Sequence, residues 1–462
     1  MIDNTSFPSH FESLYPTDSR FEEIKTILEF IKQGNSCQVI SLPGVGRSNL
    51  LGLLSYNRNI RIKHLGENQK WFHFVTIDFS QIRKRPLIDA TKFLFLSLVD
   101  SLRERKTSPK KSSFAGEDEY EKLSQIFKEA LLFKDEFVLF NGFKKAIDLL
   151  AIEKELTIVF LFDRFEEYVP MLTTEFFSNL RALRNRAKYR FSIVFSLNRP
   201  LEDLIEPALF ADYYEFLAGH TIYLPLLDKP GLDFRISYLE KSMGKKIDKK
   251  TLDEIINLTG GHGKLTRLAL EAALASSNQR LASSKNEEFL LKQKTVLGAM
   301  YEIWNSLAPS EQKILATSDK QLVISKEESF YFENIGLIKN EKITIPLFEI
   351  FIKSHLTMKQ LSNETMIYNE NANEIKKGAI VLSDQLTSSE FKLLRFLIQN
   401  KDKVINREEI INAVWQDVKS TAGVTDQALD QLIFRLRGKI ESDTNDPKHL
   451  QTVKGRGLRF SA

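Results

Sequence analysis

The sequence has very little cysteine and no long apolar run. Cys37 is the only cysteine among 462 residues, which excludes an internal disulfide and favours a reducing compartment. No apolar segment approaches the ~20 residues that a membrane-spanning helix needs. The first residues, MIDNTSFPSHFESLYP, show neither the basic region nor the apolar region of a secretory signal. We therefore expect a cytoplasmic protein with no membrane partner.

The sequence also lacks an excess of charge of either sign. Its 65 Lys and Arg residues nearly balance 61 Asp and Glu residues, which leaves a net charge of +4. On a chain of this length such a charge says nothing about partners, so any nucleic-acid surface must be local. The length itself is enough for about three domains.

A glycine-rich bend lies near the N-terminus, between an apolar run and a helical pattern. Residues 39–42 predict a strand, the letters PGVGR predict a loop, and a helix is expected from Ser48. Strand, loop and helix in this order are typical of a phosphate-binding loop, because glycines let backbone N–H groups close around an anion and the helix N-terminus adds partial positive charge. The candidate nucleotide ligands are Pro43, Gly44, Val45, Gly46, Arg47, Ser48 and Asn49.

This bend departs from the pattern G-x-x-x-x-G-K-[ST] at two positions. Ser41 replaces the first glycine, and Arg47 replaces the lysine. Arginine keeps the charge, but it is longer and planar and would not place that charge identically. We expect nucleotide binding to survive these changes more readily than hydrolysis, so that the chain is at most a weak ATPase. The alternative is an ordinary strand-to-helix turn whose glycines allow tight packing.

A second apolar run ends in a carboxylate. Residues 156–163 predict a central strand of a parallel sheet that delivers Asp163 at its C-terminal edge. An acid at this position holds Mg²⁺ in P-loop NTPases, together with a hydroxyl such as that of Ser48. The alternative is a buried strand that merely happens to end in aspartate.

The sequence identifies less clearly the residues that would orient a water molecule for hydrolysis. Arg164 stands where a second acid is usual, which leaves Glu166 and Glu167 as candidates to orient water. A further strand is predicted at 191–197, and Asn198 after it could respond to a γ-phosphate. Asparagine is also common where a loop begins, so an ordinary turn residue is the alternative for Asn198.

Residues 10–275 resemble the AAA-like ATPases of the STAND group and the archaeal replication initiators. The resemblance rests on the order of the motifs: the glycine-rich bend, Asp163, Asn198 and the sequence TGGH that ends at His262. It implies an α/β P-loop NTPase, with a parallel sheet flanked by helices, and ATP as the nucleotide. It also implies that His262 lies in a helical lid over the nucleotide. A helix-cap role for His262 is the alternative.

We expect five segments along the chain. The third of them, residues 295–356, has few outward basic residues, so we expect it to pack against the ATPase rather than to bind DNA. The segments are a P-loop ATPase-like core (1–220), a helical lid (221–294), a first winged-helix unit (295–356), a polar linker (357–365) and a winged helix-turn-helix domain (366–462).

The last segment predicts a DNA-reading helix and a basic hairpin. Leu429, Ile433, Leu436 and Ile440 recur at helical spacing and predict a buried face. The opposite face suits a major groove, since glutamine pairs with adenine, arginine reaches guanine or phosphate, and glycine permits close approach. The candidate DNA ligands are Gln427, Gln431, Phe434, Arg435, Arg437, Thr452, Lys454 and Arg456.

This segment resembles the effector domain of OmpR/PhoB-type response regulators over its whole length. The phrases FRLRGKI and QTVKGRGLRFS carry the resemblance. It implies that Gln427, Gln431 and Arg435 face bases, while Arg437, Lys454 and Arg456 meet the DNA backbone. It also implies that the loop after Trp415 can meet RNA polymerase.

The segment also departs from the family's pattern. Phe434 and Gly438 stand where members often carry basic residues, which puts the usual base code in doubt. A winged helix used only for protein contact is the alternative, although no acidic residue occurs between Lys448 and Phe460.

Together these features predict a transcription regulator in which bound ATP controls the presentation of the C-terminal domain to double-stranded DNA. A nucleotide-dependent homo-oligomer would supply a second DNA-binding domain. Two alternatives stay open. One is an ATPase that acts as a motor, loader or defence switch with hydrolysis as its main output. The other is a DNA-binding or scaffold protein with a non-functional P-loop.

Overall fold

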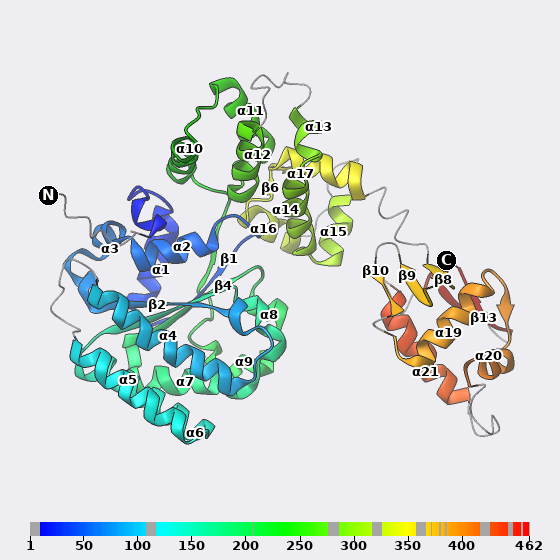
Figure 1. Ribbon diagram of the computed structural model, residues 1–462, viewed down its shortest axis with the longest axis horizontal. Coiled ribbons are helices and arrows are strands. Elements are labelled where there is room, and N and C mark those ends of the chain that lie inside the picture. The colour runs from blue at the N-terminus through cyan, green and yellow to red at the C-terminus, as the bar shows by residue number, and fades with distance from the viewer. Residues whose placement is uncertain are drawn as a thin grey trace. The chain divides into compact units, whose positions relative to one another are not determined.

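The structure is a computed structural model, and it divides into two units, Met1–Ile350 and Phe351–Ala462 (Figure 1). Among the described residues, no helix is both long enough and apolar enough to cross a membrane. The structure describes residues 10–107, 117–205, 207–275, 286–316, 326–356, 366–370, 372–377, 380–383, 386–415, 426–441, 447–453 and 456–461.

Five parallel strands form the central sheet of the first unit, in the order β2-β3-β4-β1-β5. Every residue of β1 and β4 is buried. Strands buried on both faces read as mostly apolar runs, which explains why the sequence pattern identified them, although Gln38, Ser192 and Ser196 are buried in them as well. The predicted parallel α/β fold is therefore confirmed. The strands are β1 (Cys37–Ile40), β2 (Phe72–Asp78), β3 (Thr157–Asp163), β4 (Phe191–Leu197) and β5 (Thr221–Tyr223).

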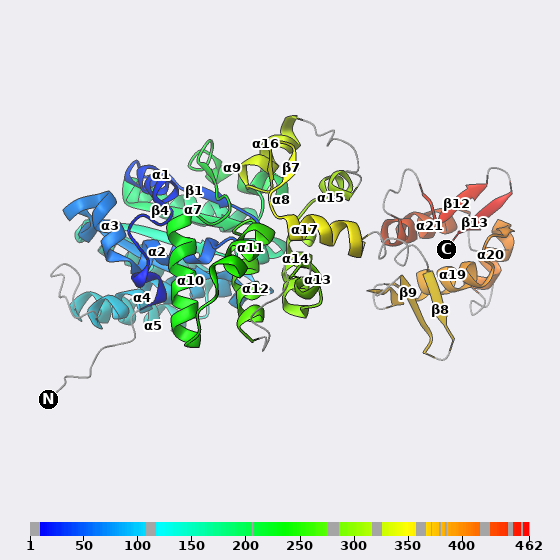
Figure 2. The same cartoon turned by 90° about the horizontal axis from the view of Figure 1, so that it is seen from above.

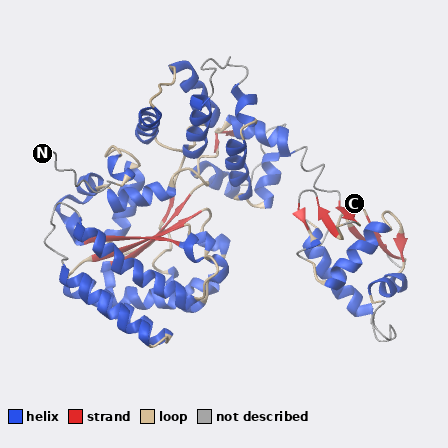
Figure 3. Ribbon diagram, viewed as in Figure 1, coloured by secondary structure: helices blue, strands red, loops and turns tan. Residues whose placement is uncertain are grey.

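Helices cover both faces of this sheet (Figure 3). Helix α1 shows why they form, since its apolar residues recur every three or four positions and Ile24, Leu28 and Ile31 are buried. The helices of this part are α1 (Phe21–Lys32), α2 (Arg47–Tyr56), α3 (Arg58–Leu65), α4 (Leu87–Thr107), α5 (Glu117–Leu132), α6 (Glu136–Ile147), α7 (Thr174–Ala187), α8 (Leu201–Leu204) and α9 (Pro207–Tyr214).

A group of helices follows β5 in the chain. Two of them, α10 and α12, drawn in green, lie next to the blue α2 (Figure 2). Gly260 ends α11 with a φ of 58°, in the left-handed region that glycine adopts without strain. The helices are α10 (Lys229–Met243), α11 (Lys249–Thr259), α12 (Gly263–Ala275) and α13 (Asn286–Leu291).

The segment that follows packs against the C-terminal edge of β4. Arg199 forms an ion pair with Glu311, and its guanidinium lies 5.0 Å from the ring centre of Tyr331. The Tyr331 hydroxyl donates to the Asn198 carbonyl at 3.1 Å. The segment consists of α14 (Lys294–Asn305), α15 (Pro309–Ala316), α16 (Lys326–Asn334), the antiparallel pair β6 (Ile338–Lys339) and β7 (Lys342–Ile343), and α17 (Pro346–Phe351).

The second unit has its own hydrophobic core, built from helices and two small antiparallel sheets. Thr387 and Glu390 form a capping box at the start of α19. The order of elements is that of a winged helix-turn-helix domain. They are β8 (Met366–Asn369), β9 (Glu374–Lys377), β10 (Ile380–Val381), α19 (Ser388–Gln399), β11 (Val404–Ile405), α20 (Arg407–Val414), α21 (Asp426–Ile440), β12 (Leu450–Val453) and β13 (Gly457–Phe460).

Candidate nucleotide-binding site and nucleic-acid interface

The loop between β1 and α2 has the backbone of an anion site. Gly44 and Gly46 have φ angles of 83° and 116°, which glycine adopts without strain. Gly46 is the N-cap of α2 and supplies no side chain to cap it. The first N–H groups of α2 therefore have no side-chain acceptor at the N-cap, and the helix N-terminus favours an anion there. Ser48 is exposed and Asn49 half-buried in this first turn.

His262 and the start of α12 hold this loop through its carbonyl groups. The Nε2 atom of buried His262 lies 2.9 Å from the Pro43 carbonyl, and its Nδ1 atom accepts the Leu265 N–H at 3.2 Å. These partners assign the proton to Nε2 of a neutral ring, and burial lowers the pKa of His262 to about 4. The Lys264 N–H donates to the Gly44 carbonyl at 2.9 Å. The contact with the Leu265 N–H is the helix-cap role considered for His262, while contact of His262 with nucleotide stays a prediction.

Arg20 also contacts the loop, although no sequence pattern marked it. Its Nη2 atom donates to the Val45 carbonyl at 3.4 Å, and its Nη1 atom donates to the Leu226 carbonyl at 3.2 Å. The side chain is only 4% exposed, and burial lowers its pKa. An arginine just before a helix is common, so only the folded chain reveals that it connects the loop with the segment entering α10.

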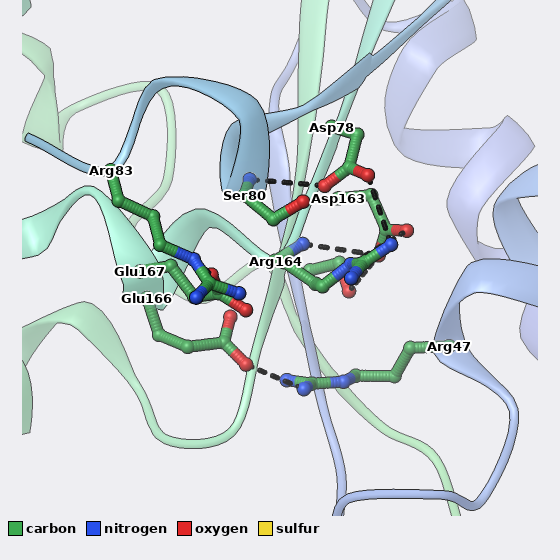
Figure 4. A network of polar contacts seen from close by, with 9 residues as sticks. Arg47, Asp78, Ser80, Arg83, Asp163, Arg164, Glu166 and Glu167 are labelled. Carbon is green, nitrogen blue, oxygen red and sulfur yellow. Dashed lines mark hydrogen bonds and ion pairs between the residues drawn. The ribbon is translucent and has the colours of Figure 1, made fainter. Parts of the chain in front are cut away.

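Arg47, the residue in place of the usual lysine, is already paired. Its Nη2 atom lies 2.6 Å from Oε1 of Glu166, and the two side chains are 11% and 17% exposed (Figure 4). The Nη1 atom of Arg47 and the Oε2 atom of Glu166 are buried and have no hydrogen-bond partner within the described part of the chain. Each therefore keeps unused bonding capacity toward a ligand.

A second arginine lies between two aspartates at the edge of the sheet. Asp78 and Asp163 are paired in register at the ends of β2 and β3. Nη2 of Arg164 donates to Asp78 at 2.9 Å, and its Nε lies 4.0 Å from Oδ2 of Asp163. Arg164 has a φ of 52°, uncommon for a residue with a side chain. Glu167 forms a separate ion pair with Arg83 (Figure 4).

Asp163 and Ser48 suit a hard divalent cation such as Mg²⁺. Asp163 is 6% exposed. Its Oδ1 atom accepts the Arg164 N–H at 3.0 Å, while its Oδ2 atom faces the guanidinium at 4.0 Å. One carboxylate and one hydroxyl, completed by water and phosphate oxygens, form a donor set that Mg²⁺ accepts. The nearby positive charge of Arg164 weakens such a site.

Asn198 lies at the end of β4, where the sequence predicted it. Its carbonyl accepts the Tyr331 hydroxyl, and its side-chain Oδ1 atom is buried without a partner among the residues described. Arg199 beside it is held by Glu311 from α15. This edge of the sheet is therefore in contact with the segment that follows α13.

A cavity of about 330 Å³ opens beside the loop. Asn49 and Phe11 are among the residues that line it, and most of its wall is apolar. Arg235, Arg267 and Glu271 contribute charged groups, and Arg267 is paired with Glu271. Its volume is within the range of small-ligand pockets, and no sequence motif marked it. Residues of α10 and α12 complete the wall: Leu232, Arg235, Ile236, Tyr238, Leu239, Ser242, Gly263, Thr266, Arg267, Leu270 and Glu271.

In the second unit, α21 has the two faces that its sequence predicted. Leu429, Ile433, Leu436 and Ile440 are all buried. Gln431, Phe434, Arg435 and Gly438 are exposed. The side chain of Gln427, the residue Lys454 and the loop after Trp415 lie outside the described residues.

Several basic side chains around α21 have partners within the unit. Lys439 donates to Oε2 of the buried Glu390 at 2.6 Å, and Nε of Arg435 lies 3.6 Å from Oε1 of Glu390. Arg437 donates to the Leu450 carbonyl and, at 2.8 Å, to the Thr452 hydroxyl. Arg437 thereby connects α21 with β12, while Arg456 is exposed in the turn between β12 and β13.

Comparison with known proteins identifies the second unit. Residues 384–460 match the family described as the C-terminal domain of transcriptional regulatory proteins, which confirms the resemblance to OmpR/PhoB-type regulators. Protein PetR of Rhodobacter capsulatus is 36% identical over 93 residues, which cover 19% of this chain and 39% of PetR. The chain thus spans about two fifths of the length of this curated relative.

Two solved structures are similar to the chain over most of its length. A Walker-type ATPase of Pyrococcus abyssi is 13% identical with a TM-score of 0.45, and the match covers 76% of this chain and 99% of that one. The ORC2 protein of Aeropyrum pernix, solved as ADPNP and ADP complexes, is 12% identical with a TM-score of 0.39, and the match covers 82% of this chain and 93% of that one.

Proposed function

We propose that this protein is a nucleotide-responsive transcription regulator, in which ATP bound by the first unit controls DNA binding by the C-terminal domain. The proposal depends most on one observation. A loop with two left-handed glycines, capped by no side chain and held by His262 and Lys264 of the lid, belongs to the same chain as a transcriptional regulatory domain. A ligand at this loop would alter its contacts with the lid.

The phosphates of ATP would lie against residues 43–49, at the N-terminus of α2. The base would enter the cavity beside Asn49, whose apolar walls and charged Arg235 suit an aromatic heterocycle with polar edges. Ser48 and Asp163 would hold Mg²⁺, which supplies positive charge against the phosphates when it is bound.

Hydrolysis would be weak or absent. Glu166 is bonded to Arg47 and Glu167 to Arg83, so neither carboxylate is available to orient water until its arginine finds another partner. Asn198 is fixed by Tyr331 through its carbonyl, although its side-chain oxygen could still face a phosphate-bound water. The arrangement favours ATP as a bound signal over ATP as a fuel.

DNA would be bound through α21 and the turn between β12 and β13. The exposed side chains of Gln431, Phe434 and Arg435 would enter the major groove, together with Gln427. Arg456 and Lys454 would contact the backbone beside Thr452, and Arg437 would fix the orientation of this hairpin. The loop after Trp415 would be available to RNA polymerase.

A single winged helix has limited reach on DNA, so specific binding needs a second half-site. ATP-dependent homo-oligomerisation of the first unit would bring the second domain and raise affinity through effective concentration. The segment 295–356, with its helices and its β6-β7 pair, would be a further winged helix. Its contacts through Glu311 and Tyr331 support a role in packing on the ATPase core rather than in binding DNA.

The experiment is DNA selection and footprinting with the full chain, with and without ATP, repeated with Ser48→Ala. We expect ATP to change the occupancy of the selected site in the wild type and to have less effect in the variant. A second candidate, a DNA-binding or scaffold protein with a non-functional P-loop, is favoured by the Arg47–Glu166 pair, which already satisfies the arginine. Absence of any nucleotide binding, with a normal DNA footprint, would establish that second candidate.

A further inference from the structure

The outward face of α21 is centred on an aromatic ring that the fold does not use. The side chain of Phe434 is 72% exposed, whereas the other large apolar residues of this helix are at most 4% exposed. The buried stripe is complete without it, so folding of the unit does not require an aromatic group here.

The neighbours of Phe434 form a short stripe along the helix. Gln431 lies three residues before it and Gly438 four residues after it, which places all three on one face. Gln431 and Gly438 are exposed, and a side chain at Gly438 would have no neighbouring atom within 4 Å. The face therefore presents an amide, a ring and bare backbone, in that order.

Two of the three cations beside this stripe are bonded within the unit. Lys439 donates to the buried carboxylate of Glu390 and Arg437 to β12. Arg435 lies 3.6 Å from the same carboxylate, with its side chain still 56% exposed. Guanine is read best by an arginine or lysine that forks onto its O6 and N7 atoms. Phe434, at the centre of this face, offers no such group, so its chemistry does not favour a G·C pair opposite the ring, and Arg435 is left for a flanking position.

An A·T pair fits the same chemistry well. Thymine alone carries a methyl group on its major-groove edge, which apolar side chains contact, and adenine offers a donor and an acceptor that glutamine pairs in bidentate fashion. We propose that Phe434 contacts the C5-methyl group of a thymine while Gln431 pairs with a neighbouring adenine. Phe434 is then a specificity-determining residue for an A·T-rich half-site.

Charge argues for DNA, rather than protein, as the occupant of this face. The hairpin region from Lys448 to Phe460 carries four basic residues and no acidic one: Lys448, Lys454, Arg456 and Arg459. A basic hairpin beside an exposed helix suits the phosphates on either side of a groove. This inference rests on the proposed DNA binding, and its test separates the two.

The test uses the full chain and a DNA site obtained by selection. Each thymine in the site is replaced in turn by uracil, which removes only the methyl group, and the dissociation constant is measured by fluorescence anisotropy. We expect one replacement in each half-site to weaken wild-type binding roughly fourfold, which corresponds to the ~0.8 kcal/mol of one buried methyl-sized group. All other replacements should have less than a twofold effect.

Variants identify the residue that senses the methyl group. Phe434→Ala should bind the thymine and uracil sites equally, and Phe434→Leu, which keeps an apolar side chain, should retain part of the difference. Phe137→Ala is the matched control, since Phe137 is 71% exposed in the first unit. It should leave both affinities unchanged.

The possible results are distinguishable. If the full chain binds no DNA, the proposed function fails and this inference fails with it. If the chain binds DNA but no uracil replacement weakens it, or Phe434→Ala keeps the full thymine preference, Phe434 does not read thymine although the proposed function stands. Unchanged DNA binding in Phe434→Ala would instead assign this ring to a protein partner and overturn the inference.

Discussion

Neutralising Glu166 should strengthen nucleotide binding rather than weaken it. Arg47 is bonded to Glu166 at 2.6 Å, so a phosphate group can use Arg47 fully only after this carboxylate has moved away. Arg47 keeps an anionic partner in the exchange, whereas Glu166 loses its cation. The variant Glu166→Gln removes the charge that competes with the phosphate, and Arg47 stays in place.

The size of the effect follows from the burial of the pair. The two side chains are 11% and 17% exposed, so solvent screens their attraction only in part. A hydrogen bond to a charged group contributes roughly 1.5–3 kcal/mol net, which would correspond to a factor of about 10 to 150 in affinity. Glutamine can still accept one hydrogen bond from Arg47, so we expect the lower end of this range, about tenfold tighter binding of ATP.

The assay is an equilibrium titration with a fluorescent ATP analogue, displaced by unlabelled ATP at fixed ionic strength. Glu167→Gln is the matched control, because Glu167 pairs with Arg83 instead and its change should alter affinity by less than about twofold. Equal or weaker binding by Glu166→Gln, or equal tightening by both variants, would refute the idea that Glu166 competes with the nucleotide.

Four further predictions concern other contacts. His262→Asn keeps an acceptor for the Leu265 N–H but loses the Pro43 contact, so ATP affinity should fall several-fold in the same titration. Because the pKa of His262 is lowered from 6.5 to about 4, the unfolded chain binds a proton that the folded chain does not. The first unit should therefore lose up to roughly 3 kcal/mol of stability through His262 as the pH falls from 6.5 to 4. Denaturant titrations at pH 7 and 4.5 should show a larger loss in the wild type than in His262→Asn, which keeps His64, whose pKa burial also lowers. Arg164→Ala removes the cation beside Asp163, so chelation of Mg²⁺ should weaken ATP binding more in this variant than in the wild type. Thr387→Ala breaks the capping box of α19 and should destabilise the second unit by about 1 kcal/mol in chemical unfolding; an unchanged transition would contradict a stabilising cap.

The features that sequence reasoning predicted are those set by local periodicity. Strands β3 and β4 are buried on both faces, which explains the mostly apolar run in each, although Ser192 and Ser196 are buried polar residues of β4. The buried stripe of α21 required apolar residues at helical spacing. Asp163 was identified because a parallel strand delivers its last residue to the edge of the sheet where ligands bind.

The features that were not predicted depend on contacts between distant segments. Arg47 and Glu166 are 119 positions apart, and their pairing depends on how two loops meet at one edge of the sheet. Arg20 contacts the Val45 carbonyl only because the start of α1 lies beside the loop. Periodicity also shows which face of a helix is exposed but not where a long side chain turns, so the bonds of Arg437 to β12 could not be foreseen. Contact of Arg437 with DNA stays a prediction.

The central claim, that nucleotide in the first unit controls DNA binding by the second, is tested most directly by one comparison of affinities. The dissociation constant for the selected DNA site is measured with and without saturating ATP, for the full chain and for residues 366–462, which contain the core of the second unit. We predict that ATP tightens DNA binding by the full chain about tenfold or more and leaves the affinity of the fragment unchanged. The same affinity for the full chain with and without ATP would contradict the account.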